Sequence, residues 1–454
     1  MTVNDFFLSS VAFWLAWVAI PLVMEILPAV FSFVVLLRKR GRRRKQIVIQ
    51  KYPEITLIIP VYNSMDCLRN CIKSVNESTY DNELIHILVV NNESKDNSFE
   101  IFTSCQKEFS DLNMTWFNAK QGKSKALNYG LFNSQGKYII HIDSDGRLHP
   151  DAIKNMVTLF EQNDKADCVT GAILTHPNEI DETKGLVKRV FRKLEFFEYC
   201  QAFLAGRNFE SEFNSIYTVS GAFSGFRKST IMKTELYNTD TVCEDTHITF
   251  QVREIMKKKV MLCDNAFFFV DPIPSLNKMY TQRQRWQRGE MEVTHIFFKR
   301  KGNKGLEGSI IKLLAYDHTF AFPRMIWYFA LICLGFMNYS FKLIIVSVGL
   351  MYLLYMFSTF LFYLSVRAYL RQYREIRDYY KKKWYLIILF PLYNFLIFWF
   401  RFAGIINSIK SNQTWKTRDL TEERIICKNI INKDFLWLIR LIRFLENKVN
   451  TDEE

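Results

Sequence analysis

Two aspartates stand two positions apart in Asp143-Ser144-Asp145, directly after a run of apolar and β-branched residues. Such a run is typical of a buried strand, so we expect both carboxylates at the end of a strand. Carboxylates in that arrangement can share a divalent cation with a diphosphate. Short Asp-x-Asp strings also occur in ordinary turns. The position at a strand end favours the metal site over the turn.

A second acidic pair, Glu244-Asp245, follows about a hundred residues later. Adjacent acids repel each other when both are buried, and this repulsion can leave one of them ready to accept a proton. Solvated acids at the start of a helix are the alternative explanation. The pair by itself does not decide between a catalytic base and a helix start.

Aromatic, basic and amide side chains are combined in Gln282-Arg283-Gln284-Arg285-Trp286. A tryptophan face suits the underside of a sugar ring, and guanidinium groups suit a diphosphate. The segment comes shortly before the chain turns strongly apolar, so a basic, aromatic membrane anchor explains it equally well. The first interpretation predicts chemistry on a sugar nucleotide beside a bilayer, and the second predicts anchoring alone.

Two further loops carry small or basic residues. Gly122-Lys123-Ser124 resembles the end of a phosphate-binding loop, but Phe117 stands where such a loop requires its first glycine. A helix beginning at Lys123, with its lysines facing a nucleotide phosphate or solvent, is the better explanation. The segment from Ser220 to Arg227 is rich in small residues and ends like a strand. It forms either an ordinary turn or the wall of an acceptor groove.

The elements that must position these residues alternate between strands and helices. The patterns predict strands at 55–60, 84–90 and 137–142, and a helix at 67–75. Strands separated by helices predict a mostly parallel α/β sheet, in which ligands sit at the carboxyl ends of the strands. The polar clusters at 91–94 and 143–145 both follow such strands. We therefore expect both clusters at the ligand-binding edge of the sheet.

The composition predicts a globular domain joined to a membrane part. Of 454 residues, 49% are hydrophobic and 23% are charged, which is too polar for a transporter and too apolar for an ordinary cytosolic enzyme. The net charge of +14 gathers beside apolar runs, at 38–45 and 367–384, as the positive-inside rule predicts. Anionic lipid is therefore the expected partner, and no nucleic-acid motif accompanies the charge.

Nine scattered cysteines without a Cys-x-x-Cys pair indicate a reducing compartment.

Four apolar runs are long enough to cross a membrane, at 6–37, 320–338, 341–366 and 385–406. Four crossings would leave the basic C-terminal tail outside, against the positive-inside rule. We therefore expect residues 385–406, which Pro391 interrupts, to re-enter the membrane or lie on its surface. Residues 434–449 have apolar side chains at helical spacing and predict an interfacial helix.

These features divide the chain into four parts. Residues 1–45 are expected to form a transmembrane helix with a basic stop, and 46–300 a cytosolic α/β domain. Residues 301–410 are expected to form transmembrane and interfacial helices. Residues 411–454 are expected to form a basic tail with an amphipathic helix.

Taken in order, the motifs resemble the membrane-bound family 2 glycosyltransferases, which include poly-N-acetylglucosamine, hyaluronan, chitin and cellulose synthases. The resemblance covers roughly residues 53–420, and four motifs in order at the usual spacings make it specific. The matching residues are Pro60, Tyr62 and Asn63 in an opening strand and nucleotide loop, Lys123 to Asn128, Asp143-Ser144-Asp145, Gly221 to Arg227, Glu244-Asp245, and Gln282, Arg285 and Trp286 of a Q-x-x-R-W signature.

The resemblance implies a GT-A fold, a UDP-sugar donor, Mg²⁺ or Mn²⁺, and inversion at the anomeric carbon. It implies that Asp145, helped by Asp143, holds the metal on the diphosphate. Asp245 of the acid pair Glu244-Asp245 is implied to take the proton from the acceptor hydroxyl. The remaining implied roles are donor binding by Pro60, Tyr62, Asn63, Asn92, Lys123 and Asp143, stabilisation of the leaving UDP by Gln282 and Arg285, and stacking of Trp286 on the acceptor sugar.

Asn91-Asn92 departs from the family pattern. The family usually has Asp-Asp at the end of its second strand, and one carboxylate reads the base. An asparagine amide can accept from uracil N3–H and donate to uracil O4, so Asn92 is still expected to bind uracil. The lost negative charge weakens the case for UDP in particular. It is consistent with a divergent subgroup, such as the glycosyltransferases associated with Gram-positive exosortase-type systems.

Three functions stay open at this point. The leading hypothesis is elongation of a polysaccharide from a glycan or glycolipid acceptor at the bacterial plasma membrane. It implies a multi-pass protein with a cytosolic catalytic domain, and export or assembly proteins as partners. The alternative is transfer of a single sugar to a lipid-linked acceptor, because about four helices hardly build a channel. The non-enzyme alternative is an inactive scaffold, which Asn91-Asn92 allows and the intact Asp143, Asp145 and Asp245 oppose.

Overall fold

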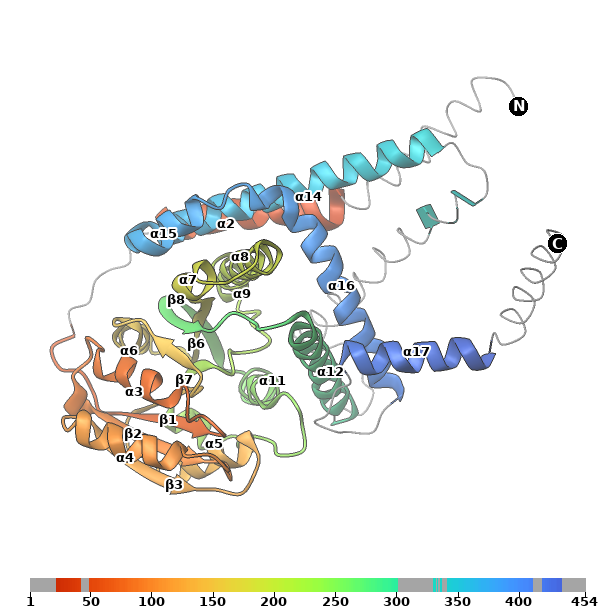
Figure 1. Ribbon diagram of the computed structural model, residues 1–454. Helices are drawn as coiled ribbons and strands as arrows, with labels where there is room; N and C mark the ends of the chain where they lie inside the picture. The colour runs from red at the N-terminus through yellow and green to blue at the C-terminus, as the bar shows by residue number, and fades with distance from the viewer. Residues whose placement is uncertain are drawn as a thin grey trace, which may run out of the picture. The chain divides into compact units, whose positions relative to one another are not determined.

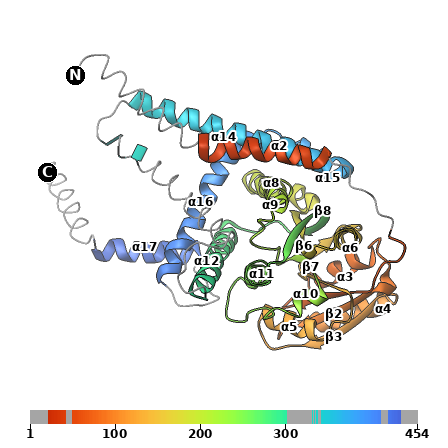
Figure 2. The ribbon, with the colours of Figure 1, turned by 180° about the vertical axis from the view of Figure 1, so that it is seen from behind.

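The structure is a computed structural model, shown from two sides in Figures 1 and 2. It describes residues 22–41, 49–300, 341–410 and 419–434, together with 330, 331, 333, 335 and 336. The chain forms two compact units, and each is described by itself. The first comprises Met1–Pro272 and Glu292–Phe395, and the second comprises Ile273–Met291 and Leu396–Glu454.

A mixed sheet of eight strands forms the centre of the first unit, in the order β3-β2-β1-β4-β7-β6-β8-β5. The strands are β1 (Ile55–Val61), β2 (Ile85–Asn91), β3 (Asn113–Asn118), β4 (Tyr138–Ile142), β5 (Gly146–Leu148), β6 (Ala166–Thr175), β7 (Phe223–Arg227) and β8 (Lys259–Val270). β1, β2, β3 and β4 run in parallel. β7 is antiparallel to both β4 and β6, and β5 is antiparallel to β8. The predicted α/β sheet is confirmed, with antiparallel pairings in its second half.

Three of the four parallel strands, β1, β2 and β4, are buried on both faces along most of their length. Every residue of β1 and β4 is buried, which explains why both appear in the sequence as continuous apolar runs. The strands predicted at 55–60, 84–90 and 137–142 agree with β1, β2 and β4 to within about one residue at each end. Ile58, Leu88 and Ile139 from these strands share one core cluster with Leu127 and Leu131 of a neighbouring helix.

Helices cover both faces of this sheet and continue into long apolar segments (Figure 1). In chain order the helices are η1 (Leu22–Ile26), α2 (Leu27–Gly41), α3 (Leu68–Asn76), η2 (Asn82–Leu84), α4 (Ser98–Glu108), α5 (Lys123–Phe132), α6 (Ala152–Gln162), α7 (Pro177–Asp181), α8 (Leu186–Gln201), η3 (Ala202–Gly206), α9 (Arg207–Glu212), α10 (Lys228–Ile231), α11 (Glu244–Phe250), η4 (Gln251–Ile255), α12 (Leu276–Arg300), α14 (Phe341–Tyr369), η5 (Leu370–Gln372), α15 (Arg374–Lys381), α16 (Leu386–Lys410) and α17 (Leu420–Asp434). The expected helices at 67–75 and from Lys123 correspond to α3 and α5.

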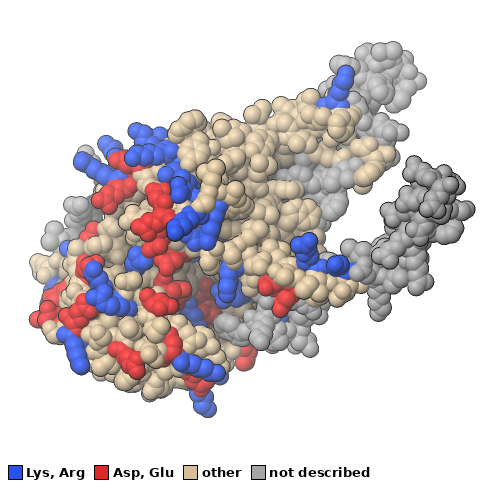
Figure 3. Space-filling model, viewed as in Figure 1, with Lys and Arg blue, Asp and Glu red and all other residues tan. Residues whose placement is uncertain are grey.

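Two described helices are long and apolar enough to cross a membrane, Phe341–Gln372 and Leu386–Asn407. α2 lies beside α14 in both views (Figures 1 and 2), and the Tyr369 hydroxyl donates to the carbonyl of Leu36 at 3.1 Å. Figure 3 shows an uncharged surface along α14 and charged side chains over α15. The runs expected at 320–338 and 434–449 lie almost wholly outside the described residues. α16 is one continuous helix around Pro391, and its path relative to a membrane stays a prediction.

The segment between α14 and α16 (residues 370–385) packs against the sheet domain of the first unit. The Tyr373 hydroxyl donates to the carbonyl of Asn265 at 3.1 Å and accepts from the Asn155 amide at 3.2 Å. Tyr380 is fully buried, and its ring stacks on Phe197 of α8 with centroids 5.0 Å apart. These aromatic contacts hold the apolar helices and the sheet domain together.

We expect Tyr380→Ala to lower the free energy of unfolding by about 3 kcal/mol or more, because it removes a fully buried ring and leaves a cavity. Tyr380→Phe is the matched control, since it keeps the ring contact with Phe197. Thermal unfolding of the detergent-solubilised protein measures both variants. Equal unfolding temperatures for the two variants would contradict the role of the ring.

Candidate active site

Three parallel strands bring their carboxyl ends to one edge of the sheet. Asn63 follows β1, Asn92 follows β2 and Asp143 follows β4. The N–H of Asn92 donates to the carbonyl of Val61 at 2.8 Å, which joins the ends of β1 and β2. Both polar clusters predicted at strand ends therefore lie at the edge where ligands bind in such sheets.

Lys123, at the start of α5, connects the acids after β4 with the acids of α11. Its Nζ lies 2.5 Å from Oδ1 of Asp143 and 3.8 Å from Oε1 of Glu244. It also donates to the carbonyl of Gly221 at 3.1 Å. Burial lowers the pKa of this ammonium, but Asp143 and Glu244 outweigh burial and the net pKa lies above its ordinary value. Lys123 therefore stays charged as the counter-ion of both acidic segments.

The turn at 143–145 concentrates negative charge. The pKa of Asp145 is raised to about 6, first because the surrounding protein desolvates its carboxyl and second because Asp143 is charged. Solvent still reaches Asp145, so a cation can approach it from outside. Ser144 between them is buried, and its Oγ lies 2.7 Å from Oγ of Ser64. This hydrogen bond holds the turn against the loop after β1.

A divalent cation fits this turn as a ligand shared with a substrate. Desolvation raises the pKa of Asp145 most, and repulsion by Asp143 raises it further; a dication would relieve that repulsion. Within the described ranges, no group of three or more His, Cys, Asp or Glu side chains is arranged to hold a metal by itself. Mg²⁺ in nucleotide sites commonly takes one or two carboxylates and completes its ligands with phosphate and water. The donor set of Asp143 and Asp145 matches that type of site.

Glu244 and Asp245 open α11 and have different surroundings. Glu244 is 6% exposed, and burial raises its pKa, with Lys123 opposing and Asp245 reinforcing that shift. Asp245 is partly exposed. Its Oδ1 accepts from the backbone N–H of Thr246 at 2.7 Å, and among the described residues no donor is bound to its Oδ2. Asp245 therefore has one carboxylate oxygen available for a proton.

The small-residue loop before β7 lies against this carboxylate. A Cβ atom on Gly221 would stand 2.9 Å from Oδ2 of Asp245, which is too close for two non-bonded heavy atoms. Thr218 in the same loop is joined to Thr246 of α11 by a 3.0 Å hydrogen bond between their hydroxyls. The loop thus approaches the acid closely because Gly221 has no side chain.

Comparisons with known proteins show which family this domain resembles. The Glycosyl transferase family 2 model matches residues 56–234, which include Lys123, Asp143 and Gly221. The poly-beta-1,6-N-acetyl-D-glucosamine synthase of Staphylococcus epidermidis is 24% identical over 315 residues, covering 69% of this chain and 71% of that protein. The synthase of the same name from Staphylococcus aureus (strain MSSA476) is 24% identical, over 58% of this chain and 61% of that protein.

The chain is a glycosyltransferase, with a match to family 2 over residues 56–234. Among solved structures, a mannosyltransferase from Pyrobaculum calidifontis in complex with GDP-Man and Mn²⁺ shares its fold, with a TM-score of 0.59 at 15% identity. That alignment covers 87% of this chain and 99% of the mannosyltransferase. The GT-A fold and the family implied by the sequence motifs are confirmed, and the roles of individual site residues stay predictions.

In this glycosyltransferase the loop after β1 is held by the loop after β2. Asn63 has a φ of 50°, a left-handed conformation that asparagine tolerates better than most residues. Its N–H donates to Oγ of Ser94 at 3.0 Å, and its Oδ1 accepts from the N–H of Lys95 at 2.9 Å. Tyr62 is 48% exposed, so its ring is open to a ligand. Pro60, by contrast, is buried inside β1.

Asn91 and Asn92 both use their side-chain oxygens within the glycosyltransferase. Oδ1 of Asn91 accepts from the N–H of Ser94 at 3.0 Å. Oδ1 of Asn92 accepts from the N–H of Gly122, and this bond fixes the residue before Lys123. The amide nitrogen of Asn92 is therefore its group for donating to a base carbonyl. Recognition of uracil by Asn92 stays a prediction, and the structure adds that Asn92 places the start of α5.

The Q-x-x-R-W residues of the glycosyltransferase lie on the part of α12 that belongs to the second unit. Arg285 is exposed, and Gln282 and Trp286 are partly exposed. The guanidinium of Arg283 lies 4.5 Å from the centre of the Trp286 ring. This cation–π contact covers one face of the indole, and stacking of a sugar on Trp286 stays a prediction.

Polar contacts in the second unit join α12 to α16 and α17. The Asn407 amide donates to Oε1 of Glu423 at 2.7 Å and to Oε1 of Gln284 at 3.4 Å. A Cβ atom on Gly404 would lie 3.1 Å from Cα of Gln284, so the two helices cross closely at this glycine. Gln284, which the family pattern leaves free, therefore serves the packing of this unit.

Sequence reasoning missed several contacts that hold the site of the glycosyltransferase. Asn128 of α5 accepts from the N–H of Tyr237 at 2.9 Å and donates to its carbonyl at 2.8 Å. The Tyr237 hydroxyl lies 3.1 Å from Nδ1 of His141. Burial lowers the pKa of His141 to about 3, so this histidine is neutral and structural. No local pattern signals these pairs because the partners stand about a hundred residues apart.

We expect Gly221→Ala to reduce sugar transfer by the glycosyltransferase by roughly a hundredfold, because displacement of a reacting group by about an ångström has effects of that size. The added methyl group would push against Oδ2 of Asp245. The rate of transfer in isolated membranes measures the effect.

Gly206→Ala is the matched control for this prediction. A Cβ atom there meets its nearest neighbour, the carbonyl oxygen of Gln201, at an ordinary 3.8 Å. We expect the control to transfer sugar at close to the wild-type rate. Equal losses in the two variants would show that Gly221 acts through general stability and not through Asp245.

Proposed function

We propose that this glycosyltransferase moves a sugar from a UDP-sugar to a growing polysaccharide at the cytosolic face of the plasma membrane, with inversion at the anomeric carbon. The observation that carries the proposal is the meeting of Asp245, Lys123 and the turn at 143–145 at the ligand edge of a family 2 domain. Similarity to poly-beta-1,6-N-acetyl-D-glucosamine synthases supports a polymer product.

Asp245 is the proposed base on the acceptor side. The acceptor hydroxyl gives its proton to Oδ2 as its oxygen attacks the anomeric carbon, and the bond from that carbon to the diphosphate breaks. Thr246 keeps Oδ1 occupied through its backbone N–H, so the other oxygen faces the acceptor. Burial raises the pKa of Glu244 and Lys123 opposes that rise, so Lys123 offsets the negative charge beside the base.

Lys123, Asp143 and Asp145 are the proposed residues of the donor side. Lys123 places a positive charge next to the turn, where negative charge builds on the leaving diphosphate. Mg²⁺ or Mn²⁺ held by Asp143 and Asp145 would neutralise that diphosphate further. Tyr62, Asn63 and the amide nitrogen of Asn92 are placed along the same edge for the nucleoside.

The apolar helices support the proposed membrane location. Two described helices meet the length and composition of a span, and α2 ends in a run of basic residues as expected for a cytosolic boundary. We propose the four parts predicted from the sequence, 1–45, 46–300, 301–410 and 411–454, as the functional division of the chain. Export or assembly proteins are the proposed partners, because a polymer needs a channel and the four spans expected from the sequence hardly build one.

The four spans expected from the sequence hardly build a channel, and this favours a second function, the transfer of one sugar to a lipid-linked acceptor. The two functions share the site chemistry and differ in the acceptor. An inactive scaffold is a weaker alternative because Lys123 and the four acids are arranged around one another. The number of sugars added is the property that separates the two enzyme functions.

Incubating membranes with a panel of radiolabelled UDP-sugars, with and without a chelator, tests the proposal. We expect one UDP-sugar to enter a ladder of products, loss of labelling when the chelator removes divalent cations, and recovery with added Mg²⁺ or Mn²⁺. A single added sugar would support the lipid-linked alternative. Labelling from GDP-sugars and not from UDP-sugars would refute the donor, and undiminished labelling in chelator would refute the cation.

We expect Asp245→Asn to reduce transfer by roughly 10²- to 10⁴-fold, because an amide cannot take the proton of the acceptor. Binding of UDP to the purified protein should change little, since Asp245 is proposed to act on the acceptor. Asp240→Asn, an exposed aspartate shortly before α11, is the control. Substantial transfer by Asp245→Asn would eliminate Asp245 as the base.

A further inference from the structure

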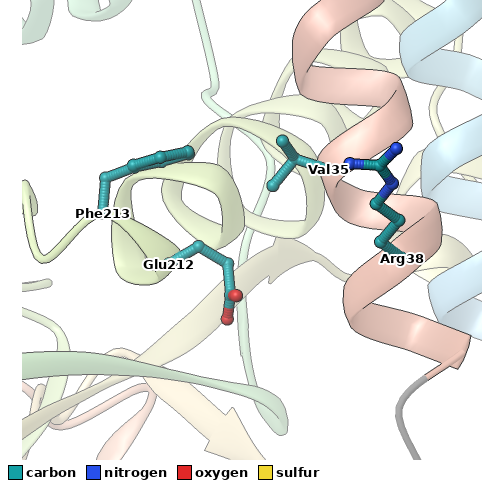
Figure 4. A pocket seen from close by; sticks show the side chains of 4 residues that line it. All are labelled: Val35, Arg38, Glu212 and Phe213. Atoms are coloured by element: carbon teal, nitrogen blue, oxygen red, sulfur yellow. The ribbon is translucent and has the colours of Figure 1, made fainter.

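A cavity of about 300 Å³ lies between α2 and α9, on the side of the first unit that carries the apolar helices. Its lining residues are Val35 and Arg38 from α2 and Glu212 and Phe213 at the end of α9 (Figure 4). Figure 4 shows the two pairs on separate helices, with Val35 directed toward Phe213. The cavity therefore has two apolar and two charged lining groups, and it lies apart from the transferase edge of the sheet.

Of the two charged residues that line the cavity, Glu212 is paired with a lysine and Arg38 can bind an anion. Lys39 forms a 3.0 Å ion pair with Glu212 and also donates to the carbonyl of Asn208 at 3.4 Å, so the carboxylate is already neutralised. Arg38 is exposed and has no ion pair with any described residue. Arg40, two residues on, lies over the ring of Tyr369 at 5.9 Å and does not line the cavity. The guanidinium of Arg38 is thus the group that an anion entering the cavity would meet.

An apolar strip leads to this guanidinium. Phe31 is 54% exposed and Phe213 is 52% exposed, and their ring centroids are 5.9 Å apart. Val34 and Leu37 on α2 are also exposed. A free phosphate ion would use Arg38 alone and would leave these side chains in water. A ligand with a phosphate and a hydrocarbon chain would use both parts of the surface.

We propose that this cavity binds the headgroup of an anionic phospholipid, with the phosphate on Arg38 and an acyl chain along Phe31, Val34 and Phe213. A planar guanidinium suits the paired oxygens of a phosphate. The basic end of α2 stands where a helix that leaves the hydrocarbon meets the headgroups. The proposal rests on the membrane location given under Proposed function. It adds a lipid site outside the transferase site.

Native mass spectrometry of the full chain, released from nanodiscs that contain phosphatidylglycerol and phosphatidylcholine, tests this site. We expect the wild-type protein to retain phosphatidylglycerol, and Arg38→Gln to retain it about tenfold less, the loss expected for one charge-assisted contact. Val35→Phe keeps the charge and fills the cavity, and it should lose the lipid as well. Arg40→Gln removes an equal charge outside the cavity and should retain it.

Three other outcomes would refute the binding of a phospholipid in this cavity. Equal losses in Arg38→Gln and Arg40→Gln would show that the lipid responds to the general positive charge of the helix end. Displacement of the lipid by millimolar inorganic phosphate would show that Arg38 binds a free anion and not a lipid headgroup. Retention of the lipid by Val35→Phe would show that the cavity is not the place of binding.

Sugar transfer measured on the same samples separates this proposal from the proposed function. Transfer without retained phospholipid would refute the lipid site and leave the function standing. A protein that stays in solution without detergent or nanodisc would refute the membrane location on which both depend. Retained lipid in a protein that transfers no sugar would support the site and count against the function.

Discussion

Repulsion among four carboxylates is the physical constraint on which this structure depends. Asp143 and Asp145 follow β4, and Glu244 and Asp245 open α11, so two acidic segments distant in sequence face one volume. Two like charges about 4 Å apart repel by about 4 kcal/mol at the effective dielectric of a protein surface. The ammonium of Lys123 offsets this repulsion by contacting both segments. The loop before α5 therefore has to hold Lys123 within reach of both acidic segments.

Accurate placement is supplied by short-range contacts between segments that are remote along the chain. Asn92 bonds the backbone before Lys123, Asn128 holds the backbone of Tyr237, and the Gly221 carbonyl accepts from Lys123. Each contact uses a neutral group, so it adds no further charge to the site. The departure at Asn91-Asn92 suits this role, because an asparagine oxygen accepts a backbone N–H without the negative charge of an aspartate.

The sequence predicted the strands and the acids at their ends because strands buried on both faces appear as mostly apolar runs. Each of these runs is followed by a short cluster of polar residues. It also predicted the loop before β7 from its small residues. It did not predict that Gly221 lies against Asp245, because that proximity depends on how β7 pairs with β4 and on where α11 then packs. The strand-like end of that segment was expected, but the antiparallel direction of β7 was missed, because the direction of a short strand is set by its partners and not by its own residues. Glu212 and Phe213 gave no signal either, since α9 is a short helix whose partner, α2, is far earlier in the chain.

The contact of Phe197 with Tyr380 has a consequence for the way the protein is made. α8 leaves the ribosome long before α15, so its aromatic face is complete while its partner has yet to be synthesised. At bacterial elongation rates this interval is on the order of ten seconds. During that time Phe196 and Phe197 present an uncovered apolar surface beside a nearly finished sheet. A nascent chain of this kind needs a chaperone, or the nearby membrane, to cover that face until the later helices emerge.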